Sequence, residues 1–415
     1  GNGDGTFQYY TNYSTGSQVW SVALGHLNGD TNLDAVVGNY GSGTISILTG
    51  NGNGTFQVVS NYTTGTHPYH VALGDVNKDS KLDIVVPNAV SGTVSLLLGN
   101  GNATFSPATN YPSGTTPVYA ALGDVNADGK TDLIVCNYDD NDVMLRFGNG
   151  DGTFGAKLEL AAGINPRAAV ISDLNKDGKQ AIAVFNGGEK TVSVLLGNGD
   201  GSFKQRINYG LDLTDGYELA ARDLDGDGWL DLIANGYNER LNILINRGDG
   251  TFGTPMVHTV GNGPVGLAIG DFNNDNRLDI AYGNDYGQSV GVLLGNDTQE
   301  LPLDNSSGLR IARGRGMLYG GSQPDTWTFD AEPGDLIYVG VENPSSSSGS
   351  SLRYRVYRPD GYEVLDFYSD GSGRGQGSLT APVAGRYSLY GSPNDSYRGE
   401  YRVRITIAKP PVQVE

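Results

Sequence analysis

The chain has 415 residues, of which 63 are glycine and 18% are charged, and its formal net charge is −19. This much glycine excludes a helix-rich protein and favours β-structure with many tight turns. The negative charge argues against nucleic acid and anionic membranes as partners, and no apolar run is long enough to span a bilayer. Residues 300–415 carry 14 acidic and 12 basic side chains, so nearly all of the net charge lies in residues 1–299.

The heptad GNGDGTF at residues 1–7 opens a repeat with a constant period. Two markers recur every 49 residues: Phe7, Phe56, Phe105, Phe154, Phe203, Phe252, and Asn39, Asn88, Asn137, Asn186, Asn235, Asn284. Each unit contains four short apolar runs separated by turn residues, without a sustained helical period. Repeated four-strand units of this length are typical of a β-propeller, whereas a parallel β-helix, the less favoured alternative, has shorter coils.

The strand count gives the N-terminal segment a role. Six units supply the first three strands, but the sixth, which ends near residue 296, has no fourth strand after it. The run TFQYYTNYSTG at residues 6–16 matches a fourth strand and precedes the first unit. We therefore predict an all-β, six-bladed propeller over residues 1–298, closed by this N-terminal strand of the same chain or of a neighbour.

An acidic loop lies between the first and second strand of each unit. The loops span residues 26–34, 75–83, 124–132, 173–181, 223–231 and 271–279. Oxygen-bearing side chains stand at loop positions 1, 3, 5 and 9, with Gly, Asn, Ser or Thr at position 6 for the turn. Alternating carboxylates and carboxamides suit Ca²⁺ better than Mg²⁺, because Ca²⁺ accepts six to eight oxygen ligands in a flexible geometry. The alternative is a set of Asx-rich turns without metal.

The loop D-x-N/D-x-D-G-x-x-D, followed by LDIVV and GNGDGTF, resembles the FG-GAP/VCBS repeats, including those of the integrin α-subunit propeller. In that family the loops bind Ca²⁺ on one side of the ring. The resemblance implies four complete sites, at Asp75, Asn77, Asp79, Asp83; Asp124, Asn126, Asp128, Asp132; Asp223, Asp225, Asp227, Asp231; and Asp271, Asn273, Asp275, Asp279. It implies two weak sites, at Asn28, Asp30, Asp34, where His26 replaces the leading Asp, and at Asp173, Asn175, Asp177, where Ala181 replaces the closing Asp.

The constant Asn and Gly residues between the strands suggest backbone roles. We expect the Asn39 series to shape the turn between second and third strands. We expect the heptad glycines to adopt positive φ in a turn, because a phosphate-binding glycine loop would open a helix.

Positions just before each first strand vary between units and are candidates for ligand contact. They include aromatic and charged side chains, and the candidates are Trp20, Tyr69, Tyr119, Arg167, Tyr217. These side chains can stack on sugar rings or contact a protein, or they can simply pack between blades. His70 and Glu218 stand beside them, and we expect His67 and His70 to form a surface pair. Cys136 follows the apolar run DLIV, so we expect a buried structural thiol.

After a linker at residues 299–308, the repeat gives way to alternating runs over residues 309–415. Such runs, broken by the turns PGD, PDG and AGR, favour an antiparallel β-sandwich. EPGDLIYVGVE, YRVYRPDG, APVAGRYSLY and GEYRVRIT resemble the bacterial pre-peptidase C-terminal domain, which implies a secreted, non-catalytic appendage. The alternating Arg353, Arg355, Arg358, Arg402 and Arg404 either form a solvated strand face or dock onto the acidic repeats.

No nucleophile elbow or HExxH motif is present, so we expect no enzyme activity. The sequence predicts a secreted or cell-surface, calcium-binding protein of adhesion or extracellular-matrix assembly, acting through protein or glycan contacts. One alternative is a self-assembling filament or surface-layer subunit that uses strand exchange as a homo-oligomer. The other is a carbohydrate-binding or polysaccharide-cleaving module, whose paired carboxylates the sequence would not reveal.

Overall fold

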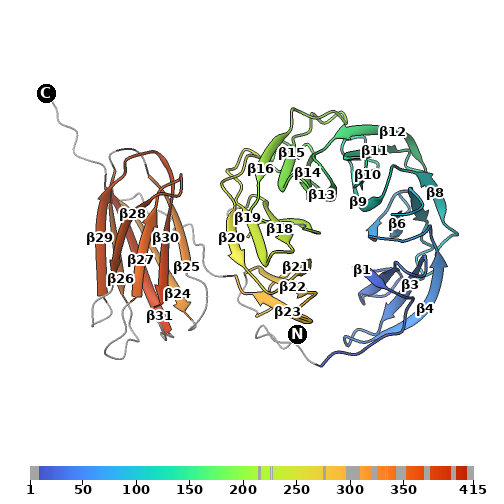
Figure 1. The fold of residues 1–415 in the computed structure, drawn as a ribbon, viewed down its shortest axis with the longest axis horizontal. Helices are drawn as coiled ribbons and strands as arrows, with labels where there is room; N and C mark the ends of the chain where they lie inside the picture. Colours follow the sequence, from blue (N-terminus) through green and yellow to red (C-terminus); the bar gives the residue numbers. More distant parts are fainter. Residues whose placement is uncertain are drawn as a thin grey trace. The chain divides into compact units, whose positions relative to one another are not determined.

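The computed structural model describes residues 9–213, 216–224, 226, 228–273, 277–295, 309–318, 325–331, 333, 335–342, 352–368, 374–393 and 399–408 (Figure 1). The chain divides into two compact units. The first comprises residues 1–222 and 229–293, and the second comprises residues 294–415 together with residues 223–228. Every regular element in the described residues is a β-strand, which confirms the all-β class.

Within the described residues the first unit contains six antiparallel sheets, numbered here in chain order. Sheet 1 has β1 (Val19–Gly25), β2 (Asp34–Asn39), β3 (Thr44–Gly50) and β4 (Phe56–Thr63). Sheet 2 has β5 (Ala72–Gly74), β6 (Asp83–Asn88), β7 (Thr93–Leu97) and β8 (Thr109–Pro112). Sheet 3 has β9 (Pro117–Gly123), β10 (Asp132–Asn137), β11 (Asp142–Gly148) and β12 (Phe154–Ala161).

The next three sheets repeat this order. Sheet 4 has β13 (Pro166–Ser172), β14 (Ala181–Asn186), β15 (Thr191–Leu195) and β16 (Ile207–Gly210). Sheet 5 has β17 (Leu219–Arg222), β18 (Asp231–Gly236), β19 (Arg240–Leu244) and β20 (Met256–Thr259). Sheet 6 has, in the described residues, only β21 (Pro264–Gly270), β22 (Asp279–Asn284) and β23 (Ser289–Leu293).

The sheets follow one another in a curved row around a central opening (Figure 1). The first strands of successive sheets lie beside each other, from β1 next to β5 through to β17 next to β21. The second strands are buried along almost their whole length, as expected for apolar runs covered on both sides. The repeated small sheets confirm the predicted four-strand unit and are consistent with a β-propeller.

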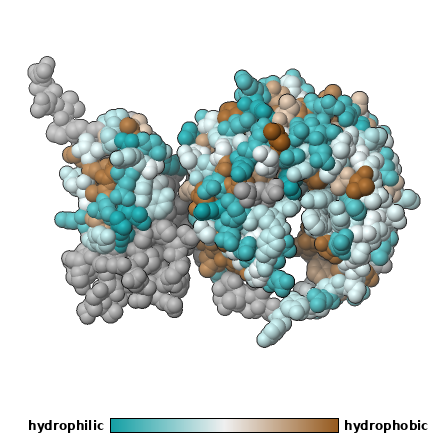
Figure 2. Space-filling view, viewed as in Figure 1, coloured by the Kyte–Doolittle hydropathy of each residue, from teal (hydrophilic) through white to brown (hydrophobic). Residues whose placement is uncertain are grey.

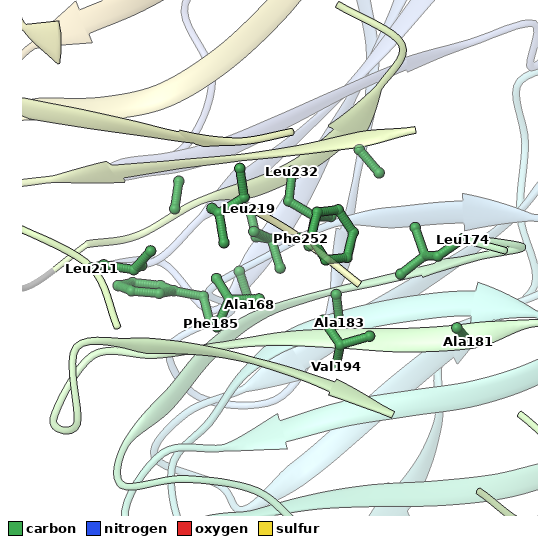
Figure 3. Packing of buried hydrophobic residues seen from close by; sticks show 14 of the residues in the cluster. Ala168, Leu174, Ala181, Ala183, Phe185, Val194, Leu211, Leu219, Leu232 and Phe252 are labelled. Atoms are coloured by element: carbon green, nitrogen blue, oxygen red, sulfur yellow. The ribbon is translucent and has the colours of Figure 1, made fainter. Parts of the chain in front are cut away.

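Apolar side chains fill the space between neighbouring sheets. Figure 3 shows this packing between sheets 4 and 5, where Phe185 of β14, Leu219 of β17 and the heptad residue Phe252 are 0 to 3% exposed. Glycines that end the first strands make room for the next sheet: a Cβ at Gly25 would lie 2.9 Å from Cδ1 of Leu73. The same close fit recurs one period later, where a Cβ at Gly74 would lie 2.8 Å from Leu122.

The two terminal sheets expose surfaces that the inner sheets bury. Val290 on β23 is 68% exposed, whereas the residues at the same repeat position in the other five sheets, Ile45, Val94, Val143, Val192, Leu241, are at most 1% exposed. Val22 on β1 is 63% exposed, whereas Val71, Ala120, Ala169, Leu219 are at most 3% exposed. In this structure sheets 1 and 6 are therefore not packed against each other as the inner sheets are.

The predicted closing strand at residues 6–16 is only partly within the described residues. Residues 9–18 form no strand, and none of them pairs with β23. Tyr13 nevertheless contacts Phe56 edge to face at 5.8 Å, and its hydroxyl accepts a hydrogen bond from the Phe56 N–H at 3.0 Å. Tyr62 of β4 makes the same pair of contacts with Phe105, at 5.8 and 3.0 Å. The N-terminal segment thus lies against sheet 1 as a fourth strand lies against the following sheet.

The described residues of the second unit form two four-stranded antiparallel sheets, in agreement with the antiparallel strands expected there. One sheet has the order β24 (Leu309–Leu318), β31 (Gly399–Ala408), β26 (Leu336–Glu342), β29 (Arg374–Thr380). The other has the order β25 (Asp325–Ala331), β30 (Gly385–Pro393), β27 (Leu352–Tyr357), β28 (Glu363–Tyr368). Both sheets contribute to one core, which includes Ile337, Tyr354 and Tyr387. The predicted linker at residues 299–308 lies outside the described residues.

Two of the C-terminal arginines are paired locally. Arg353 donates two hydrogen bonds to Asp366, at 3.0 and 2.6 Å, and Arg358 pairs with Asp360. These contacts support the solvated-strand interpretation for Arg353 and Arg358. The side chains of Arg402 and Arg404 lie outside the described residues.

Candidate functional site

The acidic loops have the backbone shape that their sequences predict. Position 6 adopts positive φ in Ser80 (64°) and Gly129 (75°). Position 4 does so as well, in Lys78 (61°) and Ala127 (57°), although the sequence pattern does not single out that position. Two left-handed residues in one nine-residue loop give a tight turn in these two loops, whereas the first loop, residues 26–34, has no residue at positive φ.

In the second loop the predicted ligand oxygens turn inward and accept backbone N–H groups. The Asp75 carboxylate accepts from Asp79 N at 3.2 Å and Ser80 N at 2.7 Å, and the Asn77 Oδ1 atom accepts from Asp79 N at 3.1 Å. Asp79 accepts from Lys81 N at 3.0 Å and forms an ion pair with the Lys81 ammonium at 3.1 Å. Asp124, Asn126 and Asp128 of the third loop repeat these contacts.

The aspartate at position 9 is fully buried and clips three parts of its sheet together. Asp83 accepts hydrogen bonds from Val76 N at 2.9 Å and from Gly99 N at 2.7 Å, so it joins the loop, β6 and the heptad. Asp132 makes the same two bonds with Val125 N at 3.0 Å and Gly148 N at 2.9 Å. Sequence reasoning assigned these residues only as metal ligands; their place at the start of an apolar strand was the available signal for a buried role.

The carboxylate and carboxamide oxygens of loops 2 and 3 are the atom types that a hard cation prefers as ligands. In each loop the other carboxylates also raise the pKa of the buried aspartate at position 9. Burial raises the pKa of Asp83, two backbone N–H bonds lower it, and the nearby Asp79 and Asp75 carboxylates raise it again. A cation would relieve this repulsion but would compete with the N–H groups for the same oxygens. Within the described residues no group of three or more His, Cys, Asp or Glu side chains is arranged to hold a metal ion.

The other four loops are described less completely or depart from the pattern. In the first loop the Nδ1 atom of His26 lies 2.9 Å from the Asn32 carbonyl, and Asp34 is a buried clip between Leu27 N and Gly50 N. The fourth loop keeps its turn bonds to Asp173, but Ala181 is buried in place of the clip. Asp225, Asp227 and Asp275 lie outside the described residues. Calcium binding therefore stays a prediction for all six loops.

The constant Asn residues have the expected backbone role and extend it to the preceding connection. Asn39 is buried; its Oδ1 atom accepts Gly16 N at 3.0 Å, and its Nδ2 atom donates to Thr44 and Ser46. Asn88 repeats the bond with Gly65 N at 3.0 Å. The carboxamides of Asn39 and Asn88 thus hold the chain before a first strand against the turn between second and third strands, and Asn186 does the same through Gly163 N, whereas Asn284 Oδ1 has no such partner among the described residues.

The heptads form tight hairpin turns, which confirms their interpretation as turns requiring positive φ. Gly150 and Gly152 have φ values of 77° and 83°, and Asn149 N donates to Thr153 O at 2.9 Å. The other heptads in the described residues repeat this closure. Cys136 is likewise buried as predicted, and burial raises the pKa of its thiol.

The variable positions before the first strands gather at the end of the sheets opposite the acidic loops, because adjacent strands are antiparallel. We use the name end cluster for the aromatic and arginine side chains at this end of the sheets: Trp20, Tyr40, Tyr69, Tyr138, Arg167, Tyr217 and Tyr237. Trp20 is 51% exposed and lies 5.4 Å from Tyr40 and 5.2 Å from Tyr69, ring centroid to centroid. Figure 2 shows the unit from one side, with a hollow at the centre of the curved row.

A β-bulge places Trp20 and Arg167, and a third bulge lies at Val118, which occupies the same repeat position in sheet 3. The strand register shifts by one residue at Trp20 in β1, at Val118 in β9 and at Arg167 in β13, so each of them is the extra residue of a bulge. A bulge turns a side chain away from the sheet plane, and bulges are frequent at binding sites. The Arg167 guanidinium is held between two rings, 4.6 Å from the Tyr138 centroid and 4.7 Å from the Tyr217 centroid.

The end cluster is also connected across non-adjacent sheets. Burial raises the pKa of Tyr69 to about 12, and Arg167 of sheet 4 lowers it while Tyr217 of sheet 5 raises it. The end cluster thus brings together four of the five predicted ligand residues. The rings of the end cluster contact one another between sheets, which was one of the two roles expected for them. Trp20 nevertheless exposes half of its surface to solvent.

A second row lies one residue further along, at Ser21, His70, Tyr119 and Glu218. His70 stacks on Tyr119 at 3.9 Å, and burial lowers the pKa of His70 to about 4. Burial raises the pKa of Glu218 to about 7, and the Glu218 charge contributes to a raised pKa at Tyr119. The predicted surface pair of histidines is wrong, because His67 stacks on Tyr40 at 4.1 Å and His70 Nδ1 is buried. Each histidine ring packs against an aromatic ring that is more than 25 residues away in sequence.

Comparison with known proteins identifies one sequence family. The profile described as FG-GAP-like repeat matches the chain five times, at residues 26–86, 88–135, 124–184, 173–234 and 223–282. No curated protein is significantly similar in sequence. Among the described residues no helix is long and apolar enough to cross a membrane.

Three solved structures illustrate the structural similarities. A putative 6-phosphogluconolactonase from Bacteroides uniformis is 16% identical, with a TM-score of 0.49, over 66% of this chain and 83% of its own. An exo-β-1,3-galactanase from Phanerochaete chrysosporium is 9% identical, with a TM-score of 0.36, over 95% and 96%. The pre-peptidase C-terminal domain of a Bacillus anthracis collagenase is 20% identical, with a TM-score of 0.20, over 23% and 87%. Similarities at this level carry no argument about function.

Proposed function

The chain belongs to the FG-GAP-like repeat family, and we propose that it is a non-catalytic, calcium-binding protein of adhesion or extracellular-matrix assembly. It acts at the cell surface or after secretion, through protein or glycan contacts. The observation that supports this proposal is the end cluster, where a half-exposed tryptophan and an arginine held between tyrosines lie on bulges of separate sheets. Exposed aromatic and arginine side chains on a rigid frame are typical of binding surfaces.

The test is a binding panel that contains matrix proteins and glycans, probed with the intact chain. We expect Trp20→Ala and Arg167→Ala to weaken binding at least tenfold. Tyr362→Ala is the matched control, because Tyr362 is 68% exposed on the second unit, beside Arg358. Binding that survives both end-cluster substitutions would contradict the proposed site.

We further propose that the loops at Asp75 and Asp124 bind Ca²⁺ most readily among those fully described. Asp75, Asn77 and Asp79 would hold the ion in one loop and Asp124, Asn126 and Asp128 in the other, with the buried Asp83 and Asp132 beside them. A bound ion would stiffen the turn between first and second strands. Equal melting temperatures in millimolar CaCl₂ and in excess EGTA would contradict this proposal.

The finer fold proposal is a six-bladed ring closed by the N-terminal strand. It is supported by the exposed Val22 and Val290, and by Tyr13, which lies on Phe56 as Tyr62 lies on Phe105. Leu24 is 57% exposed, and the residue one period later, Leu73, packs on Gly25 of the preceding sheet. In a closed ring Leu24 would pack in the same way on Gly270 of sheet 6. There is room for it, because a Cβ at Gly270 would have only Phe272 within 4 Å.

Closure can be tested with the double variant Leu24→Cys and Gly270→Cys under oxidising conditions. A cross-linked monomer on a non-reducing gel is the result expected for a ring closed within one chain. A cross-linked dimer would favour the alternative, a homo-oligomer or filament assembled by strand exchange. Absence of any cross-link would contradict closure at this interface.

One observation favours a carbohydrate-active alternative. A carboxyl with a pKa near 7, such as Glu218, is suited to general acid catalysis. Release of reducing ends from polysaccharides, lost in Glu218→Gln, would support that alternative over the non-catalytic proposal.

A further inference from the structure

The second row beneath the end cluster contains polar groups that its neighbours do not satisfy. The Oγ atom of Ser21 and the Nδ1 atom of His70 are buried and have no hydrogen-bond partner among the described residues. The Glu218 carboxyl forms no hydrogen bond or ion pair with any described side chain, while its backbone N–H is held by Asn235 at 3.0 Å. Buried polar atoms are nearly always paired, so the two unpaired atoms, Ser21 Oγ and His70 Nδ1, call for an explanation, and the partly exposed Glu218 carboxyl stands at the same repeat position.

The repeat explains why these groups occur together. Ser21, His70 and Glu218 occupy the same position of units 1, 2 and 5, each one residue after a variable residue of the candidate ligand set. The first strands lie beside each other around the central opening, so this position recurs at the same height in successive sheets (Figure 1). His70 contacts the ring of Tyr119, and Tyr119 is in turn electrostatically coupled to Glu218. The row is therefore in contact from sheet 2 to sheet 3, whereas sheet 4 carries Ala168 at this position and sheet 5 carries Glu218.

We propose that the end cluster and this row together bind an uncharged saccharide, with Trp20 and Tyr69 against a sugar face and Ser21, His70 and Glu218 hydrogen-bonded to its hydroxyl groups. This proposal deepens the proposed function by naming the ligand class at the same site, and it rests on that function.

The chemistry of the site favours this class over others. Aromatic faces pack on the C–H faces of sugar rings, and a mixed set of hydroxyl, imidazole and carboxyl groups pairs with sugar hydroxyls, which both donate and accept. A purely apolar ligand would leave Ser21, His70 and Glu218 unsatisfied. The net charge of −19, nearly all in residues 1–299, disfavours a polyanion at this opening.

The experiment is an array of neutral gluco-, manno-, galacto- and xylo-oligosaccharides, with polygalacturonate and a panel of matrix proteins beside them. Binding is measured by calorimetry with the intact chain. We expect at least one neutral oligosaccharide to bind, and we expect Trp20→Ala and His70→Ala to weaken it at least tenfold. Ser21→Ala removes a single oxygen and should weaken binding about threefold or more without changing the melting temperature, which a merely structural role would not predict.

The possible outcomes distinguish failure of the saccharide assignment from failure of the proposed adhesion function. Absence of binding to every neutral oligosaccharide, or binding to polygalacturonate alone, overturns the saccharide class. If a matrix protein then binds and is lost in Trp20→Ala and Arg167→Ala, the proposed function stands without the inference. Saccharide binding that is unchanged in Ser21→Ala and His70→Ala overturns the assignment of this row.

Discussion

Replacing Asp132 by alanine tests whether the ninth loop residue is a structural clip independent of calcium. The Asp132 side chain is fully buried, and its two oxygens accept Val125 N at 3.0 Å and Gly148 N at 2.9 Å. Asp132→Ala leaves two buried N–H donors without partners, each at a cost of about 1–3 kcal/mol. Alanine itself fits, because Ala181 occupies the same position of sheet 4 at 1% exposure.

We therefore expect Asp132→Ala to destabilise the first unit by roughly 3 kcal/mol, or about 5–10 °C in melting temperature. The measurement is thermal and urea denaturation followed by circular dichroism, in excess EGTA so that no calcium contributes. The matched control is Asp128→Ala in the same loop: its ion pair with Lys130 is exposed to solvent, and such pairs contribute about 0–1 kcal/mol. If both variants lose equal stability in EGTA, or if Asp132→Ala loses stability only relative to a calcium-loaded protein, the clip is refuted.

Three further predictions concern other parts of the first unit. Burial raises the pKa of Glu218 from 4.5 to about 7 in the folded protein, so the free-energy cost of burying its charge is absent below about pH 4.5 and grows as the pH rises from there to about 7. Urea denaturation should find Glu218→Gln as stable as the parent at pH 4 and more stable by up to roughly 3 kcal/mol at pH 8. A stability difference that does not depend on pH would contradict this. Tyr13→Phe removes the acceptor of the Phe56 N–H and should cost about 0.5–1.5 kcal/mol in the same assay, whereas Tyr9→Phe, at a fully exposed residue, should cost nothing. Cys136 should react with a thiol reagent only at the rate of unfolding, because it is buried and its thiol pKa is raised; fast labelling of the native protein would show that sheet 3 opens locally.

Much of the fold could be predicted from local pattern. The 49-residue spacing, the apolar runs and the turn residues predicted four short strands in each unit, and these chemical preferences act over a few residues. The same holds for the positive φ of Gly129 and for the hairpin around Gly150. The alternating runs after residue 309 likewise predicted a sandwich, because strands with one buried side carry their own period.

The candidate site was predicted in part, since the variable positions of a repeat are visible in sequence. Variation between units was the signal for four residues of the end cluster, Trp20, Tyr69, Arg167 and Tyr217. They lie at the same end of the sheets because each stands at or just before the start of the first strand of its own repeat. The inward stacking of His67 on Tyr40 and of His70 on Tyr119 was not predicted, since each partner belongs to a neighbouring sheet.

The repeat, its strands and the residue types at each loop and each end of the sheets follow from the amino-acid sequence. The role of each of those residues depends on what the folded sheets place beside it. Asp83 and Asp132 have the same spacing as a metal ligand, yet they lie buried between two backbone N–H groups, because the heptad of their own sheet folds back over the loop. Burial likewise sets the pKa values of His70 and Glu218, because only the assembled sheets remove water from around them.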